Sequence, residues 1–168
     1  AEVIRVVNKS SNNVMTRVLL LTLASELGQR PATVEGGVQR VLQTLNSQGI
    51  ETNGVVIENG SGLARRSRVS ADQVAKMLQV AWRSPAMPEY VSSLAILGTD
   101  GTLRRRLRGD ARGYAHMKTG ALRDSRAIAG YVLSQSGKRY VFVSLVNNPQ
   151  AFKARDFENQ VVDWLISR

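Results

Sequence analysis

The spacing of apolar residues changes near Gly113, and this change restricts the fold more than any other feature of the sequence. Before it, apolar side chains recur every three or four residues, as they do on one face of a helix. After it come three short runs rich in the β-branched and aromatic residues that favour strands. The last stretch returns to helical spacing. Helices, then antiparallel strands, then one covering helix predict an α+β fold.

The helical pattern gives ranges for five helices. We predict the end of a helix at residues 1–9, a helix at 14–27 stopped by Gly28, and another between Pro31 and Gly49. Ser70 and Gln73 form a capping-box pattern, which predicts a fourth helix that ends before Pro85 and Pro88. The fifth carries Phe157, Val161, Trp164 and Leu165 on one face.

Strands are expected at residues 114–118, 128–134 and 139–146. The last two are joined by Gln135-Ser136-Gly137-Lys138, which predicts a hairpin. Residues 55–57 are a further short strand candidate, before the turn Asn59-Gly60-Ser61-Gly62.

Composition removes several kinds of chemistry. Without cysteine the chain forms no disulfide, thiolate nucleophile or cysteine-ligated zinc site. Its single histidine, His116, excludes a histidine metal cluster, so no metal and no cofactor is expected. No apolar run reaches the roughly 18–20 residues of a membrane span. Residues 1–7 lack the pattern of a signal peptide.

The formal net charge of +10 attracts polyanions of any kind. Arginine supplies most of this charge, including the run Arg104, Arg105, Arg106, Arg108 and Arg112. The run motivates an alternative function, a basic polyanion- or nucleic-acid-binding module. A protein that binds single-stranded nucleic acid also needs aromatic side chains on which the bases stack, and only Tyr114 lies near the run. We therefore favour a solvated loop and expect no nucleic acid as a partner.

Two short motifs can carry catalytic chemistry. Ser11-Asn12-Asn13 has the form Ser-x-Asn between two predicted helices, and Lys118-Thr119-Gly120 lies at the end of the strand predicted to open the sheet. Each is weak alone, because a loop serine is usually a helix cap and Lys-Thr-Gly suits any strand edge. Together they are two of the three elements of the penicillin-recognising serine enzymes, in the same chain order.

Four longer segments make this resemblance specific. They are Asn8-Lys9-Ser10-Ser11-Asn12-Asn13-Val14-Met15, the stretch from Asn59 to Ser70, Gly98-Thr99-Asp100-Gly101-Thr102-Leu103, and the stretch from His116 to Tyr131. In this order they are similar to segments of the type-C penicillin-binding proteins, the D-alanyl-D-alanine carboxypeptidase/endopeptidases. The resemblance implies that residues 1–168 are a single C-terminal segment of a DD-peptidase fold like that of the serine β-lactamases. Residues 1–112 would be its mainly helical part with the Ser-x-Asn loop, and residues 113–168 the Lys-Thr-Gly strand, hairpin and C-terminal helix.

The resemblance also implies roles for the motif residues. Ser11 would relay a proton between the nucleophile's lysine and the leaving amine, and Asn13 would orient that lysine and the substrate amide. Lys118 would direct its charge at the substrate carboxylate and Thr119 its hydroxyl. Strict alternation points these two to opposite strand faces, so the role of Thr119 rests on the resemblance, helped by the local freedom that Gly120 gives the strand. Ala121 would give a backbone N–H to the oxyanion hole. His116 should face the same side as Lys118. A place lining the cleft is one interpretation, and we favour the other, an ordinary surface or packed histidine.

The sequence departs from the family pattern in four places. Ala121 stands where the family usually has Ser or Thr, and Asn12 and Asn59 each replace Asp. Most important, the family's nucleophile lies in a Ser-x-x-Lys motif, and this sequence contains none. Three residues before its lysines stand Val6, Gln73, Ala115, Gln135 and Gln150. We therefore expect the chain alone to be inactive.

The implied substrate is a peptidoglycan peptide ending in D-Ala-D-Ala, with β-lactam antibiotics as acylating ligands in the periplasm. The family's sheet takes its other strands from the missing N-terminal part, so we expect an exposed strand edge that associates with that part or with a second copy. All of this depends on Ser11 meeting Lys118 across 107 positions (118 − 11).

Overall fold

The structure is a computed structural model that describes residues 1–26, 28, 30–107 and 109–168. It divides into two compact units, which are described separately. The first consists of residues 1–11 and 78–168, and the second of residues 12–77. None of the helices in the described part of the chain is long and apolar enough to span a membrane.

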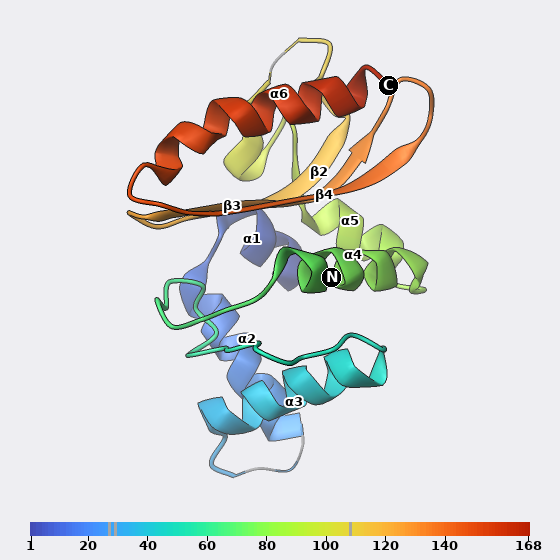
Figure 1. Cartoon of the computed structure of the whole chain (residues 1–168). Helices are drawn as coiled ribbons and strands as arrows, with labels where there is room; N and C mark the ends of the chain where they lie inside the picture. Colours follow the sequence, from blue (N-terminus) through green and yellow to red (C-terminus); the bar gives the residue numbers. More distant parts are fainter. Residues whose placement is uncertain (27, 29, 108) are drawn as a thin grey trace. The chain divides into compact units, whose positions relative to one another are not determined.

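A four-stranded antiparallel sheet organises the first unit. Its order is that of the sequence, β1 (Ala95–Ile96), β2 (Ala115–Ala121), β3 (Ser125–Leu133) and β4 (Arg139–Asn147) (Figure 1). β3 and β4 form the predicted hairpin. Gly130 lies opposite Met117, where an added Cβ would stand 2.2 Å from the carbonyl oxygen of His116. Only glycine permits this close approach of β3 to β2.

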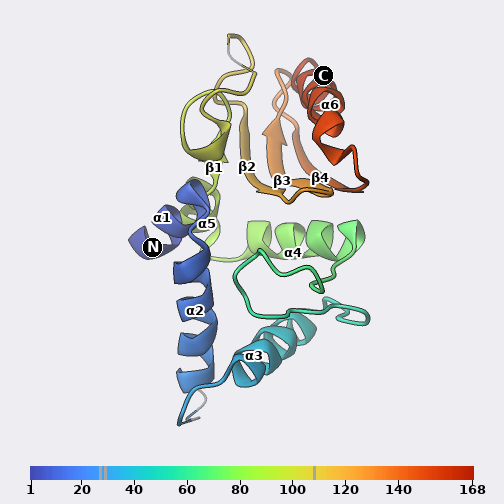
Figure 2. The same cartoon turned by 90° about the vertical axis from the view of Figure 1, so that its left-hand side faces the viewer.

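One face of the sheet packs against α6 (Ala154–Ile166), as Figures 1 and 2 show. Because strand side chains alternate between faces, Ala115 and Met117 of β2 point to the same side. Their neighbours in the buried core are Ile128, Val132, Val162 and Ile166. The predicted covering helix and the α+β fold are thereby confirmed.

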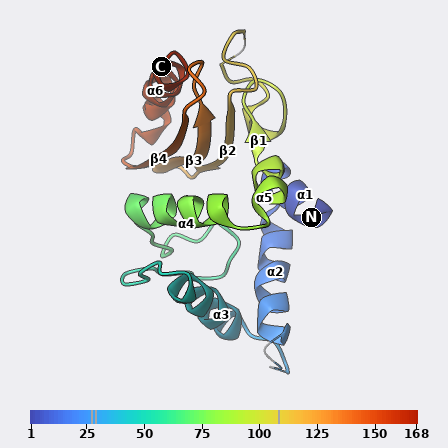
Figure 3. The ribbon, with the colours of Figure 1, turned by 90° about the vertical axis from the view of Figure 1, so that its right-hand side faces the viewer.

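The opposite face carries His116, Lys118 and Tyr131, and other helical segments of the first unit lie on this side. Tyr131 donates to the carbonyl of Leu78 at 2.6 Å, and its ring lies 5.1 Å from that of Trp82. Leu78 and Trp82 belong to α4 (Ala71–Arg83). Figure 3 shows α5 (Met87–Ser93) beside α1 (Glu2–Ser10).

The second unit consists of α2 (Asn13–Glu26), α3 (Val34–Ser47), a long connection and the start of α4. At Gly37 an added Cβ would stand 2.2 Å from the carbonyl oxygen of Leu20, so glycine permits the close approach of α3 to α2. The predicted capping box is confirmed at α4, because the N–H of Gln73 donates to Ser70 Oγ at 3.1 Å and the N–H of Ser70 to Gln73 Oε1 at 2.9 Å.

Some elements differ from the predictions. The strand predicted at residues 55–57 is wrong, because Val56 forms only an isolated bridge with Arg68. β1 and α5 were not predicted, and the Lys-Thr-Gly motif lies inside β2 rather than at its end. Leu27, the predicted last residue of the second helix, lies outside the described residues. The predicted division of one segment at residues 112 and 113 stays a prediction.

The basic run of residues 104–112 is not a solvated loop throughout. Arg106 is only 4% exposed, and its guanidinium donates at 2.8 Å to Glu158 of α6, which is completely buried. Arg126 of β3 donates to the same carboxylate at 2.9 Å. Arg104 and Arg105 are exposed, and Arg108 lies outside the described residues. The expectation of a solvated loop is therefore wrong for Arg106, which supports the packing of α6.

Candidate active site

The structure brings Ser11 and Lys118 together. The Lys118 ammonium donates a hydrogen bond to Ser11 Oγ across 107 positions of sequence, within the first unit. Ser11 follows α1, and Lys118 lies in the middle of β2. The meeting of these two groups, on which the enzyme hypothesis depends, is present, whereas their catalytic roles stay predictions.

Ser11 holds an uncommon backbone conformation. Its φ of 53° and ψ of 49° lie in the left-handed region, and its N–H donates to the carbonyl of Val7 to close α1. This region is normally occupied by glycine at a helix end, and a residue with a side chain adopts it at a cost of about 1 kcal/mol. Such strain persists where surrounding contacts hold it, and it is enriched at functional sites.

Lys118 is half-buried, and its position changes its acid–base behaviour. Burial lowers the pKa of its ammonium, because the charged form loses water. Besides Ser11, the ammonium donates to the carbonyl of Thr119 at 2.8 Å. None of the ion pairs found among the described residues involves Lys118. The role of its charge toward a substrate carboxylate stays a prediction.

The backbone of β2 beyond Lys118 has an open edge. β1 pairs only with His116 and Met117, so residues 118–121 have β3 on one side and, within the part of the chain that the structure describes, no strand on the other. The N–H of Leu122 donates toward β3, to Ser125, while the carbonyl of Ala115 accepts from Leu97 on the other side. Alternation along the strand then points the N–H groups of Thr119 and Ala121 to the open edge.

The Thr119 hydroxyl donates to Thr102 Oγ1 at 2.8 Å. Thr102 belongs to η1 (Gly101–Leu103), a single turn of 3-10 helix after β1. Gly120 pairs regularly with Ala127, and a Cβ there would meet only ordinary contact at 3.7 Å. The expected use of Gly120's conformational freedom is therefore not needed for the Thr119 contact.

His116 shares the face of Lys118, as alternation predicts. Its Nδ1 lies 3.1 Å from the carbonyl of Val91 in α5. Burial lowers the pKa of His116, although the bond to Val91 opposes this. These contacts agree with the packed histidine that the sequence analysis favoured.

Asn13 lies in the second unit, and its role of orienting the nucleophile's lysine and the substrate amide stays a prediction. Its amide donates to the carbonyl of Ser61 at 2.5 Å. Asn12 accepts from the N–H of Met15 at 2.9 Å, and Asn59 accepts from the N–H of Ser61 at 3.0 Å. A carboxylate oxygen would accept the same bonds, which explains why Asn can replace the family's Asp at positions 12 and 59.

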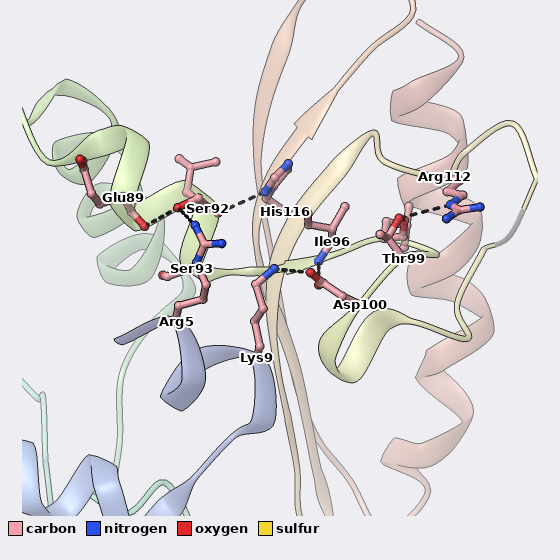
Figure 4. A network of polar contacts seen from close by, with 12 residues as sticks. Arg5, Lys9, Glu89, Ser92, Ser93, Ile96, Thr99, Asp100, Arg112 and His116 are labelled. Carbon is pink, nitrogen blue, oxygen red and sulfur yellow. Dashed lines mark hydrogen bonds and ion pairs between the residues drawn. The ribbon is translucent and has the colours of Figure 1, made fainter. Parts of the chain in front are cut away.

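Three residues near the site were missed by the sequence reasoning. Lys9 forms an ion pair with Asp100, and Thr102 contacts Thr119 (the ion pair is drawn in Figure 4). All three lie in segments that carry the family resemblance, but nothing in a single sequence indicates which of their side chains meet. The described residues contain no group of three or more His, Cys, Asp or Glu that could hold a metal.

Comparisons with known proteins find the chain similar to one family of peptidases. Residues 1–167 match the D-Ala-D-Ala carboxypeptidase 3 (S13) family. Carboxypeptidase DacB of Mycolicibacterium smegmatis is 36% identical over 154 residues, which cover 88% of this chain and 33% of that protein. A D-alanyl-D-alanine carboxypeptidase of Actinomadura sp. is 34% identical over 146 residues, covering 83% of this chain and 27% of that protein.

Among solved structures, penicillin binding protein 4 of Haemophilus influenzae, in complex with a β-lactam, matches with a TM-score of 0.85. The identity is 22%, and the match covers 96% of this chain and 41% of that chain. The chain thus spans 33% and 27% of the length of the two sequence relatives.

Proposed function

The chain belongs to the D-Ala-D-Ala carboxypeptidase 3 (S13) family. From this premise we propose that it supplies the Ser-x-Asn and Lys-Thr-Gly elements of a serine-type D-Ala-D-Ala carboxypeptidase/endopeptidase. The observation that carries the proposal is the hydrogen bond from the Lys118 ammonium to the Ser11 hydroxyl. The nucleophile would come from a Ser-x-x-Lys motif outside these 168 residues, because the sequence contains none.

The contact between Lys118 and Ser11 suits the proposed proton relay. An ammonium has no lone pair, so Ser11 Oγ must accept in this bond and its own O–H remains free to donate. In acylation, the nucleophilic serine would attack the peptide carbonyl and the C–N bond to the last D-alanine would break. The serine's proton would pass through the Ser-x-x-Lys lysine and Ser11 to the leaving amine. Water would then hydrolyse the acyl-enzyme.

Substrate recognition would use the open edge of β2. An extended peptide can add to such an edge as a further strand. The charge of Lys118 and the hydroxyl of Thr119 would attract the terminal carboxylate, and the N–H of Ala121 would donate to the oxyanion. One such donor is worth on the order of 10²–10³ in rate. Ala121 provides the same backbone N–H that Ser or Thr of the family would provide, but it lacks their hydroxyl.

The proposed partners follow from this chemistry. They are peptidoglycan peptides ending in D-Ala-D-Ala and β-lactam antibiotics, which would acylate the nucleophile outside the cytoplasm, in the periplasm. The β-lactam complex of the Haemophilus influenzae protein supports the antibiotic as a ligand. β4 pairs only with β3 among the described strands, and its other edge would accept the N-terminal part of the enzyme or a second copy.

Labelling with a fluorescent penicillin tests the proposal. We expect no label on the 168-residue chain and a covalent label on the complete enzyme, in which this chain is joined to a Ser-x-x-Lys segment. Ser11→Ala and Lys118→Ala should each slow labelling of the complete enzyme by at least roughly a hundredfold. A label on the chain alone would contradict the missing nucleophile, and a complete enzyme that never takes up label would refute the function.

A further inference from the structure

We propose that Lys9 and Asp100 are positioning residues, whose ion pair keeps Ser11 beside Lys118. That the ion pair supports catalysis rests on the proposed function, whereas its support of the contact between Ser11 and Lys118 does not. Lys9 stands two residues before Ser11 near the end of α1, and Asp100 stands directly before η1. Figure 4 shows the ion pair between these two elements. Neither residue would touch the substrate.

The carboxylate of Asp100 is fixed at both oxygens. Oδ1 accepts from the N–H of Ile96 at 2.8 Å, and Oδ2 pairs with Lys9. Burial raises the pKa of Asp100, but the Ile96 N–H and Lys9 together outweigh it, so the pKa lies below its usual value. Lys9 is 19% exposed and Asp100 34%. The pair is therefore better shielded than an exposed surface ion pair, whose contribution to stability is small.

The backbone gives an independent sign that α1 ends against this turn. An added Cβ on Gly101 would stand 2.9 Å from the carbonyl oxygen of Lys9 and 2.9 Å from the Cβ of Ala95. The φ of Gly101 is 53°, which also favours glycine. The end of α1 and the turn after β1 are thus in contact through both charge and close packing.

The same turn reaches the strand that carries Lys118. Thr102, two residues after Asp100, accepts the hydrogen bond from the Thr119 hydroxyl at 2.8 Å. Residues 100–102 therefore link the end of α1, which carries Ser11, to the neighbour of Lys118 on β2. Ser11 is also the last residue of the first unit, in a strained conformation that needs support from such contacts.

A double-mutant cycle in the 168-residue chain tests the linkage without catalysis. The pKa of Lys118 is measured by NMR of ¹³C-labelled lysine, which is practical because the chain has five lysines. Ser11→Ala should lower this pKa by about one pH unit, because the ammonium loses an acceptor. In an Asp100→Asn background, Ser11→Ala should change it by less than a third of that amount.

Two further variants serve as controls. Lys9→Arg preserves the charge and should retain most of the effect of Ser11→Ala. Asp72→Asn removes an exposed ion pair with Lys76, at 2.8 Å, and should leave the effect intact. If Asp100→Asn does not fold by circular dichroism, Lys9→Gln replaces it, because that variant keeps the bond of Asp100 to Ile96. Unfolding of both would overturn the proposal, since the pair would then support the unit as a whole.

The outcomes separate this inference from the proposed function. An equal effect of Ser11→Ala with and without Asp100 would refute the positioning role and leave the function untouched. In the complete enzyme, Asp100→Asn should slow penicillin acylation roughly tenfold to a hundredfold with little change in initial binding, and Lys9→Arg should retain most of the rate. A complete enzyme that binds no penicillin would refute the function, while the NMR cycle would still decide the role of the pair.

Discussion

The two units hold their polar site residues in different ways. In the first, the contacts join segments far apart in the chain, with 107 positions between Ser11 and Lys118 and 91 between Lys9 and Asp100. In the second, Asn12 and Asn59 contact residues three and two positions away, although Asn13 contacts Ser61, 48 positions away. All nine aromatic residues also lie in the first unit. The geometry around Lys118 therefore depends on the packing of a whole sheet, whereas Asn12 and Asn59 depend mainly on local turns.

The largest loss of stability is expected from a variant that disrupts the packing of the first unit. Glu158→Gln would leave Arg106 and Arg126 without their shared carboxylate, at a cost of about 3–5 kcal/mol. Both tryptophans, Trp82 and Trp164, lie in this unit, so their fluorescence should report unfolding at lower denaturant concentration. Asp72→Asn, at an exposed ion pair, is the control and should change little. An unchanged midpoint for Glu158→Gln would show that the first unit does not depend on this cluster.

A matched pair of glycine variants sharpens the comparison. Gly130→Ala and Gly37→Ala would each place a Cβ 2.2 Å from a backbone oxygen, the first in the sheet and the second between α2 and α3. Each should destabilise its own unit by about 1–3 kcal/mol. Only Gly130→Ala should shift the tryptophan fluorescence transition and the NMR signal of Lys118.

Gly120→Ala is the control for this pair, because its Cβ would make only ordinary contact with Ala127. Gly120→Ala should lower the free energy of unfolding by less than Gly130→Ala or Gly37→Ala does. Equal changes in the Lys118 signal for Gly130→Ala and Gly37→Ala would contradict the expectation that each glycine supports its own unit.

Lowering the pH should produce the smallest change in stability, again in the first unit. A pKa lowered by folding means that ionised Asp100 stabilises the fold above its unfolded pKa of about 3.9, and that this contribution is lost as the pH falls through the lower folded value. The contacts of Asn12 and Asn59 use amides, which do not titrate in this range. NMR signals of Lys9 and Ser11 should therefore shift below about pH 4, and those of the two asparagine side chains should not. Asp100→Asn should abolish the shift at Lys9.

Much of the fold follows from local sequence patterns. The hairpin, the covering helix and the capping box of α4 were predicted because each depends on residues close in sequence. β1 has only two residues, and α5 has seven with Pro88 in its first turn, so neither gives a clear pattern. Residues 55–57 have a strand-like composition, but among the described residues they have no partner strand. Whether such a segment pairs depends on the tertiary structure, which its local sequence does not indicate.

The site divides in the same way. Ser11 and Lys118 were found because their motifs resemble a family, and their contact could be stated in advance. Asp100 and Thr102 lie in a segment that also shows the resemblance, but their partners Lys9 and Thr119 become visible only when the segments are folded together. Arg106 was misjudged because a run of arginines does not indicate which side chain is buried beside a carboxylate.

The open edge of β2 limits what a single substitution can change. Thr119 and Ala121 present main-chain N–H groups there, and every residue except proline carries that group. Under the proposed function, an inhibitor that binds along the strand through these groups would leave few routes of escape by single substitution. An inhibitor that needs a side-chain hydroxyl at position 121 would find none in this sequence.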